Sequence, residues 1–420
     1  MAQPVELLAP AGSYRKLEQA YAFGADAAYV GLPLFSLRAR ENDMTLEELS
    51  KARELATQLN KKLYFTLNIF ARNRKLNPLQ NQMEEIIKLK PDALIMSDPG
   101  MMNMVREKFP EVPIHLSVQA NCMNWQSVKF WHEALNIERV ILSRELSLNE
   151  IKEIKQRVPD VELEAFVHGA ICIAYSGRCL LSSYFSYRDA NQGVCDNSCR
   201  ENYKVFAAPA NDTEYFLEDF RNPGKLYPIH ESEEGTTIMN AKDLALIEHL
   251  QEIIDAGVCS LKIEGRSKSE YYVSMVTKAY RQALDQIYAG KSFDPKVWED
   301  LEKVSNRGYH RGFMIAEDPA QMQNYDTACA YKSTHKFIGL EKQSEADARE
   351  GYVAFEVRNK LKLGETVELV EPHQQARPVK VEGLLNAKGE EVAEVHGGTG
   401  VFYLKLAQAP AKYSLLCKTN

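Results

Sequence analysis

Half of the eight cysteines lie in one stretch, GAICIAYSGRCLLSSYFSYRDANQGVCDNSCRENY, residues 169–203. They are Cys172, Cys179, Cys195 and Cys199, in the spacing C-x6-C-x15-C-x3-C. Four thiolates are enough to bind one zinc ion or one iron–sulfur cluster. Both pairs are wider than the CxxC pairs of structural zinc sites, and the pattern is not that of a ferredoxin. The spacing predicts a metal-type centre of either kind, the alternative being that some of these thiols are small buried side chains.

The remaining cysteines, Cys122, Cys259, Cys329 and Cys417, stand singly in apolar or mixed runs. A free cysteine in such a run behaves as a small hydrophobic side chain, so we expect these four to fill the core. Cys122 differs in one respect, because it follows the fifth predicted strand at the same end as the cysteine-rich loop.

Polar side chains close most of the predicted strands. They are Asn68, Asp98, Gln119, Asn121, Arg144, Glu145, His168, Glu264 and Arg266. If the strands form a parallel barrel, their carboxyl ends meet at one mouth, which is where barrel active sites are built. We predict Asn68, Glu164 and His168 as catalytic, with His168 or Glu164 moving protons. A hydrogen-bonded structural histidine is the alternative for His168.

Arginines near this mouth are candidates for holding a carboxylate or a phosphate, because a guanidinium group forms forked hydrogen bonds. We predict Arg144, Arg178 and Arg266 for this role, with Arg38 and Arg40 as further candidates; salt bridges to nearby glutamates are the alternative. The chain has no GxSxG, HExxH or P-loop motif, and no Ser-His-Asp triad can be recognised in its sequence.

Eight short apolar runs are predicted as strands: 5–10, 27–32, 62–70, 93–98, 114–119, 139–145, 161–169 and 260–265. Amphipathic helices are predicted between them, over 13–24, 45–60, 147–158, 240–257 and 266–290. Thr45 with Glu48, and Ser147 with Glu150, have the capping-box spacing.

This alternation predicts an α/β fold, a (β/α)8 TIM-like barrel over residues 1–290. An open doubly wound sheet is less favoured, because the first turn reads APAGSY rather than GxGxxG. Residues 170–240 form an insertion far longer than a usual connection between a strand and a helix, and the four clustered cysteines lie in its first part. After a connector over 291–334, short alternating strands predict a small all-β barrel domain over 335–420.

The composition is that of a globular protein, with a net charge of −7. Residues 331–420 carry 13 Lys and Arg against 12 Asp and Glu, so the negative charge lies in residues 1–330. The net negative charge argues against a non-specific nucleic-acid binder whose surface is coated in Lys and Arg. If the protein binds RNA, the contacts must come from local basic segments. Candidates are 71–77, 265–269 and 306–312, the last with Arg307 and Arg311. No apolar run could span a membrane and no secretory signal is present, so we expect a cytoplasmic protein with reduced thiols.

Three segments resemble the collagenase-like bacterial peptidases, a U-type family of unsettled mechanism. They are residues 6–32, the block ELEAFVHGAICIAYSGRCLLSSY, and LKIEGRSKSEYYV at 261–273. The central block looks like the family signature E-x-F-x-x-G-x-x-C-x6-C, which here supplies Glu164, Phe166, Gly169, Cys172 and Cys179. The length and the β-rich tail are similar to the branch of tRNA hydroxylation proteins.

The resemblance implies prephenate-dependent hydroxylation of the tRNA wobble uridine to 5-hydroxyuridine, independent of oxygen. It also implies a 4Fe-4S iron–sulfur cluster, prephenate as the oxygen donor, tRNA as partner and an electron-donor protein. The cluster ligands carry over to Cys172, Cys179 and Cys195, with Cys199 as the fourth because it is the only other thiol nearby. Two alternatives stay open: a cysteine- or metal-dependent peptidase, and a zinc-stabilised RNA-binding factor without catalysis.

Overall fold

The computed structural model describes residues 4–37, 44–172, 174–179, 190, 195, 215–218, 226–232, 235–237, 241–315, 331–342, 349 and 351–420. The chain divides into two compact units. Unit 1 comprises residues 1–17, 26–268 and 306–331, and unit 2 comprises residues 18–25, 269–305 and 332–420. None of the helices in these described ranges is long and apolar enough to cross a bilayer.

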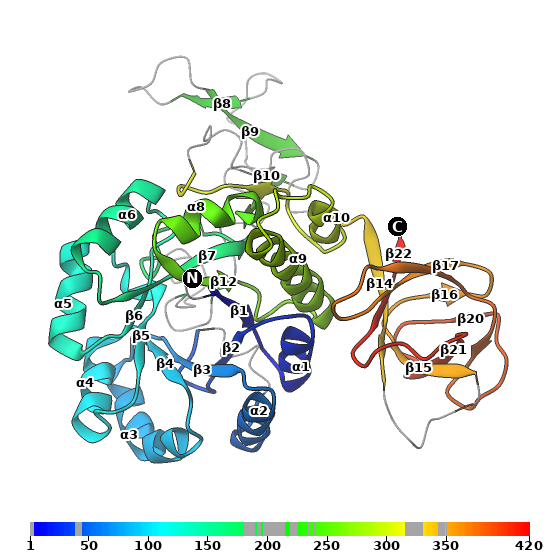
Figure 1. Cartoon of the computed structure of the whole chain (residues 1–420), viewed down its shortest axis with the longest axis horizontal. Coiled ribbons are helices and arrows are strands. Elements are labelled where there is room, and N and C mark those ends of the chain that lie inside the picture. Colours follow the sequence, from blue (N-terminus) through cyan, green and yellow to red (C-terminus); the bar gives the residue numbers. More distant parts are fainter. Residues whose placement is uncertain are drawn as a thin grey trace. The chain divides into compact units, whose positions relative to one another are not determined.

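Unit 1 is a closed parallel barrel (Figure 1). Its eight strands are β1 (Glu6–Pro10), β2 (Ala27–Gly31), β3 (Lys62–Leu67), β4 (Ala93–Met96), β5 (Ile114–Leu116), β6 (Arg139–Ile141), β7 (Glu162–Ala170) and β12 (Val258–Ile263). Each strand pairs with the next, and β12 pairs in parallel with both β7 and β1, which closes the ring. The predicted (β/α)8 barrel is therefore confirmed, and the open doubly wound sheet is wrong.

Helices follow the strands around the barrel. They are α1 (Tyr14–Ala22), α2 (Leu46–Gln58), α3 (Asn73–Lys88), α4 (Pro99–Lys108), α5 (Trp125–Leu135), α6 (Leu148–Arg157) and α8 (Leu250–Asp255), with 3-10 turns η2 (Val118–Ala120) and η5 (Ile247–His249). Both predicted capping boxes are present. The Glu48 amide donates to Thr45 Oγ1 at 3.2 Å, and the Thr45 amide donates to Glu48 Oε2 at 2.7 Å. Ser147 and Glu150 repeat this pattern at the start of α6, so local sequence fixes where two of the helices begin.

The insertion after β7 contains a small antiparallel sheet of β8 (Tyr215–Glu218), β9 (Leu226–Ser232) and β10 (Gly235–Thr237). The predicted helix over 240–257 is wrong in its first half. Residues Asp243–Ala245 form β11, which pairs antiparallel with the end of β7, and β13 (Tyr309–His310) pairs with β11. Tertiary pairing with β7 here outweighs the helical periodicity.

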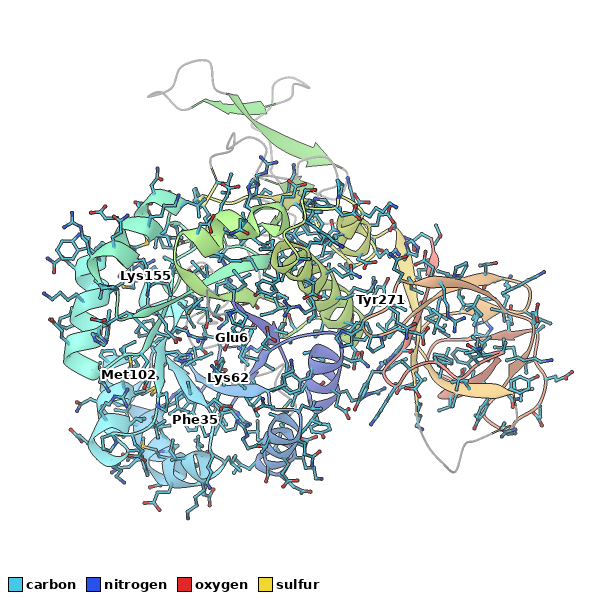
Figure 2. All side chains as sticks on the ribbon, viewed as in Figure 1. Glu6, Phe35, Lys62, Met102, Lys155 and Tyr271 are labelled. Atoms are coloured by element: carbon cyan, nitrogen blue, oxygen red, sulfur yellow. The ribbon has the colours of Figure 1, made fainter. Side chains whose placement is uncertain are left out.

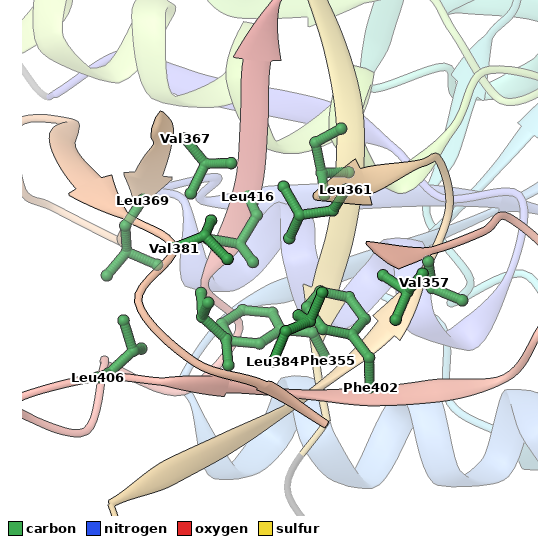
Figure 3. Close-up of a cluster of buried hydrophobic side chains, with 13 residues drawn as sticks. Phe355, Val357, Leu361, Val367, Leu369, Val381, Leu384, Phe402, Leu406 and Leu416 are labelled. Carbon is green, nitrogen blue, oxygen red and sulfur yellow. The ribbon is translucent and has the colours of Figure 1, made fainter. Parts of the chain in front are cut away.

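Unit 2 contains α9 (Glu270–Tyr288), α10 (Val297–Glu302) and an all-β region, as predicted for the tail. Its main sheet is built from β14 (His335–Glu341), β15 (Tyr352–Val357), β17 (Thr366–Val370), β18 (Arg377–Lys380), β19 (Leu384–Leu385), β21 (Val401–Lys405) and β22 (Leu415–Thr419). A short ribbon pairs β16 (Leu361–Lys362) with β20 (Glu394–Val395). Figure 3 shows the core that these strands share, in which Phe355, Phe402 and Leu416 are fully buried.

Candidate functional site

The inside of the barrel carries a chain of buried charges. Glu6 lies at the start of β1 (Figure 2), and its Oε1 accepts from Arg139 Nη1 at 2.7 Å. The same nitrogen donates to Glu164 Oε2 at 3.3 Å, and Lys262 Nζ donates to Glu164 Oε1 at 2.7 Å. Glu164 has no exposed surface. Two carboxylates and two cations thus alternate through the interior, and each charge has an opposite partner.

Neighbouring side chains complete this interior network. Tyr64 Oη and Ser260 Oγ donate to Glu6 at 2.6 and 2.8 Å. Burial opposes the ionisation of Glu6, but Arg139 and these hydrogen bonds outweigh it and lower the pKa of Glu6. Burial, with Arg139 and Lys262 nearby, holds the pKa of His115 well below its usual range. Glu164, predicted to carry protons, therefore belongs to a network of buried ion pairs inside the barrel.

His168 occupies β7 opposite Ala245 of β11, and its ring centroid lies 5.4 Å from that of Tyr309. The side chain is 1% exposed, and burial lowers its pKa to about 3, although Asp243 acts in the opposite direction. The imidazole is therefore neutral near pH 7. A neutral imidazole can orient a bound group by hydrogen bonding, but it carries no positive charge inside the protein near pH 7.

Asn68 lies at the carboxyl end of β3, as predicted, and connects three segments of the mouth. Its Oδ1 accepts from the Leu37 amide at 3.0 Å, and its Nδ2 donates to Ser117 Oγ at 3.4 Å. Its backbone oxygen accepts from Ser97 Oγ at 3.1 Å. The side chain therefore joins the end of β3 to Leu37 and to the end of β5, and the backbone oxygen joins it to the end of β4, which is a positioning role.

The three predicted anion-holding arginines have different surroundings. Arg266 is 5% exposed and donates to Thr66 Oγ1 at 2.9 Å and to the Leu37 carbonyl oxygen. The Arg144 guanidinium carbon lies 3.7 Å from the Phe166 ring centroid, and its Nη2 lies 3.6 Å from Glu264. Arg178 is exposed and donates to Asn121 Oδ1 at 3.3 Å. Arg144 and Arg178 therefore keep more room for a ligand than Arg266 does.

Two glycines let the signature segment pass close to the barrel rim. Gly177 has φ +75°, and a Cβ there would lie 2.1 Å from the Gln119 carbonyl oxygen. Gly169 has φ +107°, and a Cβ there would lie 2.6 Å from the backbone oxygen of Glu264. Only glycine combines these left-handed conformations with such close contacts. Residues 174–179 are thereby held against the ends of the barrel strands.

A chain of side-chain hydrogen bonds fixes the same segment. Arg178 binds Asn121, whose Nδ2 donates to Ser143 Oγ at 3.1 Å, and Ser143 Oγ donates to Glu145 Oε2 at 2.6 Å. Asn121 has φ +52°, which asparagine tolerates better than most residues. The signature segment is therefore connected to the carboxyl ends of β5 and β6.

The described thiols fall into two groups. Cys172 and Cys195 are exposed and Cys179 is half-buried, all at or beyond the carboxyl end of β7. Cys122 and Cys417 are buried, and burial raises the pKa of each to about 12; the pKa of half-buried Cys259 is raised to about 11. The prediction of core filler is confirmed for Cys122 and Cys417, and Cys329 lies outside the described residues. Cys172 and Cys195, in contrast, are exposed to solvent, and Cys179 is half-buried like Cys259.

The donor chemistry of this loop fits a thiolate-bound centre, since three accessible sulfur atoms follow one strand end. Within the described ranges, no three His, Cys, Asp or Glu side chains are arranged to hold a metal ion. Cys199 and most of residues 180–200 lie outside those ranges. The convergence of the four thiols stays a prediction.

One predicted RNA contact is wrong. Arg307 is 2% exposed, and its side chain donates to Asp243 Oδ1, in part at 3.2 Å from Nε. It cannot meet a phosphate at the surface, because the buried Asp243 already holds it. Arg311 keeps 46% of its side chain exposed and lies 3.6 Å from Glu248. Of the two arginines in residues 306–312, only Arg311 is exposed.

The sequence analysis missed the interior cations Arg139 and Lys262. Each stands in an otherwise apolar strand, at a position whose side chain faces inward. The sequence signal that could have revealed them is a charged residue inside a run of Val, Leu and Ile. Such a charge must be paired if the strand is buried on both faces. The partner could not be read from the chain, because 133 residues separate Glu6 from Arg139.

A closed parallel barrel whose signature cysteines follow the seventh strand, joined to an all-β region, defines the class of protein. Residues 12–324 match the family described as Peptidase family U32, and residues 333–417 match its C-terminal domain, so the chain belongs to this family.

Named relatives differ in what they are said to do. The chain is 41% identical over 442 residues to "tRNA hydroxylation protein P" of Escherichia coli (strain K12), covering 98% of this chain and 96% of the relative. It is 33% identical over 283 residues to "23S rRNA 5-hydroxycytidine C2501 synthase" of the same organism, covering 67% of this chain and 40% of that protein. It is 30% identical over 384 residues to "Collagenase" of Porphyromonas gingivalis (strain ATCC BAA-308 / W83), covering 87% and 86%.

Proposed function

We propose that this protein hydroxylates RNA, converting the wobble uridine of tRNA to 5-hydroxyuridine without molecular oxygen. The observation that carries the proposal is that Cys172 and Cys195 are exposed and Cys179 is half-buried beyond the carboxyl end of β7, whereas Cys122 and Cys417 are buried. The names of two relatives, one acting on tRNA and one on ribosomal RNA, support RNA as the substrate class.

Cys172, Cys179, Cys195 and Cys199 would hold a 4Fe-4S cluster, which when bound supplies electron transfer or Lewis-acid chemistry. The chain's own residues would then place the oxygen donor. Prephenate carries two carboxylates, and Arg144 and Arg178 are the mouth arginines suited to forked hydrogen bonds with them. An electron-carrying protein partner completes the proposal.

The neutral His168 and the tethered Asn68 would contribute by orientation. His168 lies on β7 four residues before Cys172, and its buried imidazole would give or accept a hydrogen bond without changing charge. Asn68 keeps the ends of β3 and β5 in register through Ser117. These roles do not require His168 to change its protonation state near pH 7.

The test is to purify the protein without oxygen and measure iron, sulfide and zinc together with 5-hydroxyuridine in tRNA from complemented cells. Cys172→Ala and Cys179→Ala should abolish brown colour and modification together, whereas Cys122→Ala should retain both. A colourless protein that remains fully active would contradict the proposal.

A peptidase remains the second candidate, because of the family description and the relative named collagenase. Gelatin cleavage with and without chelator tests it. A zinc-stabilised RNA-binding factor would instead show zinc without sulfide, and no modification would depend on it.

A further inference from the structure

The barrel mouth differs in charge from the opposite end of unit 1. Cations lie on the segments that follow the carboxyl ends of the strands, and we call them the rim cations: Arg72, Arg74, Arg178, Lys268 and Arg311. The four arginines are exposed and Lys268 is half-buried. Arg311 belongs to this end because the nearby Met314 carbonyl oxygen accepts a hydrogen bond from the Leu148 amide at 3.2 Å. Leu148 is the first residue of α6.

The acidic residues at the mouth are held by neighbouring groups. Asp98 accepts from the amides of Met101 at 3.0 Å and Ala71 at 3.1 Å, so it caps α4. Asp243 is buried against Arg307. Glu145 and Glu264 are similarly engaged by Ser143 and Arg144. These four carboxylates are thus engaged by neighbouring groups, whereas Glu248 is exposed and lies 3.6 Å from the rim cation Arg311.

The opposite end shows the reverse balance. The turns that lead into β2, β4, β5, β6 and β7 carry acidic residues: Asp26, Asp92, Glu111, Glu138 and Asp160. Lys61 and Lys90 are the basic residues in the comparable turns. Among the described residues, the mouth therefore carries four exposed arginines, more basic side chains than the comparable turns at the opposite end, and these would attract a polyanion.

Exposed aromatic rings accompany the rim cations. Tyr175 is 56% exposed and Phe313 is 53% exposed, and they stand within three residues of Arg178 and Arg311 respectively. Tyr331 is 52% exposed, and Lys268 Nζ lies 4.5 Å from its ring centroid. We call Tyr175, Phe313 and Tyr331 the rim rings. Single exposed rings are ordinary on a surface, but three beside cations at one end of a barrel are not scattered.

We propose that the rim binds a single-stranded RNA loop, with unstacked bases on the rim rings and phosphates on the rim cations. This rests on the proposed function and identifies how the RNA would be held. Phosphates alone would explain the cations, but a duplex keeps its bases stacked and offers nothing to an exposed ring. Unpaired bases stack on aromatic side chains whatever their identity, so rings and cations together favour a loop.

The experiment measures binding of a fluorescein-labelled RNA hairpin and of a blunt RNA duplex of equal length. Tyr331→Ala should weaken hairpin binding by about 5-fold or more, and leave duplex binding nearly unchanged. Arg311→Gln should lower the slope of log K against log salt by about 0.7. Tyr288→Ala, an exposed tyrosine of unit 2, and Lys90→Gln, at the opposite end of the barrel, are the matched controls.

Equal loss of hairpin and duplex binding in Tyr331→Ala, or wild-type hairpin affinity in that variant, would overturn the rim proposal. Binding is read without chemistry, so it is separable from the proposed function. Cys172→Ala should bind the hairpin normally while losing modification. Normal hairpin binding by a wild-type protein that never hydroxylates RNA would reject the function and leave the rim intact.

Discussion

At the scale of single residues, burial decides what Glu164 can do. It is fully buried between Lys262 and Arg139, so removing its charge leaves two interior cations with less compensation. We predict that Glu164→Gln lowers the free energy of unfolding by about 3–5 kcal/mol, measured by denaturant titration. Glu162→Gln is the control, since Glu162 also binds Arg139 but keeps 53% of its side chain exposed. A stable but inactive Glu164→Gln protein would instead support a proton-carrying role.

Burial of His168 gives a prediction about pH. Its pKa is about 3 in the folded protein, against roughly 6.5 in the unfolded chain. Between these values the unfolded state binds the extra proton, so the stability from keeping His168 neutral is present above pH 6.5 and is lost as pH falls. Wild-type protein should therefore lose about 2 kcal/mol more than His168→Gln between pH 7 and pH 5.

Denaturant titrations of both proteins at the two pH values check this. The comparison between variants cancels the contribution of His115, another buried histidine, whose pKa is also lowered. If the free energy of unfolding depends on pH equally in wild type and His168→Gln, folding does not lower the pKa of His168.

At the scale of elements, the signature segment depends on one close backbone approach. We predict that Gly177→Ala displaces residues 174–179, because the added Cβ would meet the Gln119 oxygen at 2.1 Å. Iron bound per chain after anaerobic purification should fall several-fold. Gly290→Ala is the control, because Gly290 has a similar φ of +64° but nothing within 4 Å of the added atom. Equal iron in both variants would mean that the segment does not position the thiols.

Elements and their order could be predicted from the sequence further than the site could. The eight barrel strands, the two capping boxes and the all-β tail follow from apolar runs and local spacing, and all are present. β11 was missed because its three residues form a strand only through pairing with β7. The burial of Arg307 was missed because its partner Asp243 lies 64 residues away. Cys172 and Cys179 could be singled out by spacing, whereas their geometry depends on residues far along the chain.

At the scale of the whole molecule, the division into two units predicts two separable stabilities. In unit 2, Asp300 Oδ2 accepts from Lys278 Nζ at 2.7 Å, and Lys303 Nζ lies 3.5 Å from Oδ1 and 2.7 Å from Glu368. Lys278, Asp300 and Lys303 are each at least nine-tenths buried. This cluster joins α9, α10 and β17 through charges that have little access to water.

Asp300→Asn should therefore destabilise unit 2 by about 3–5 kcal/mol, because two buried ammonium groups lose a shared carboxylate. Trp298 on α10 is the tryptophan of unit 2, so a protein with Trp125→Phe and Trp131→Phe reports unfolding of that unit by fluorescence. The fluorescence midpoint in denaturant should fall in Asp300→Asn and stay unchanged in Glu299→Gln, whose side chain is exposed on the same helix. Matching midpoints in these two variants would show that the buried cluster adds nothing to unit 2, and that its strands and helices are held together by their apolar core alone.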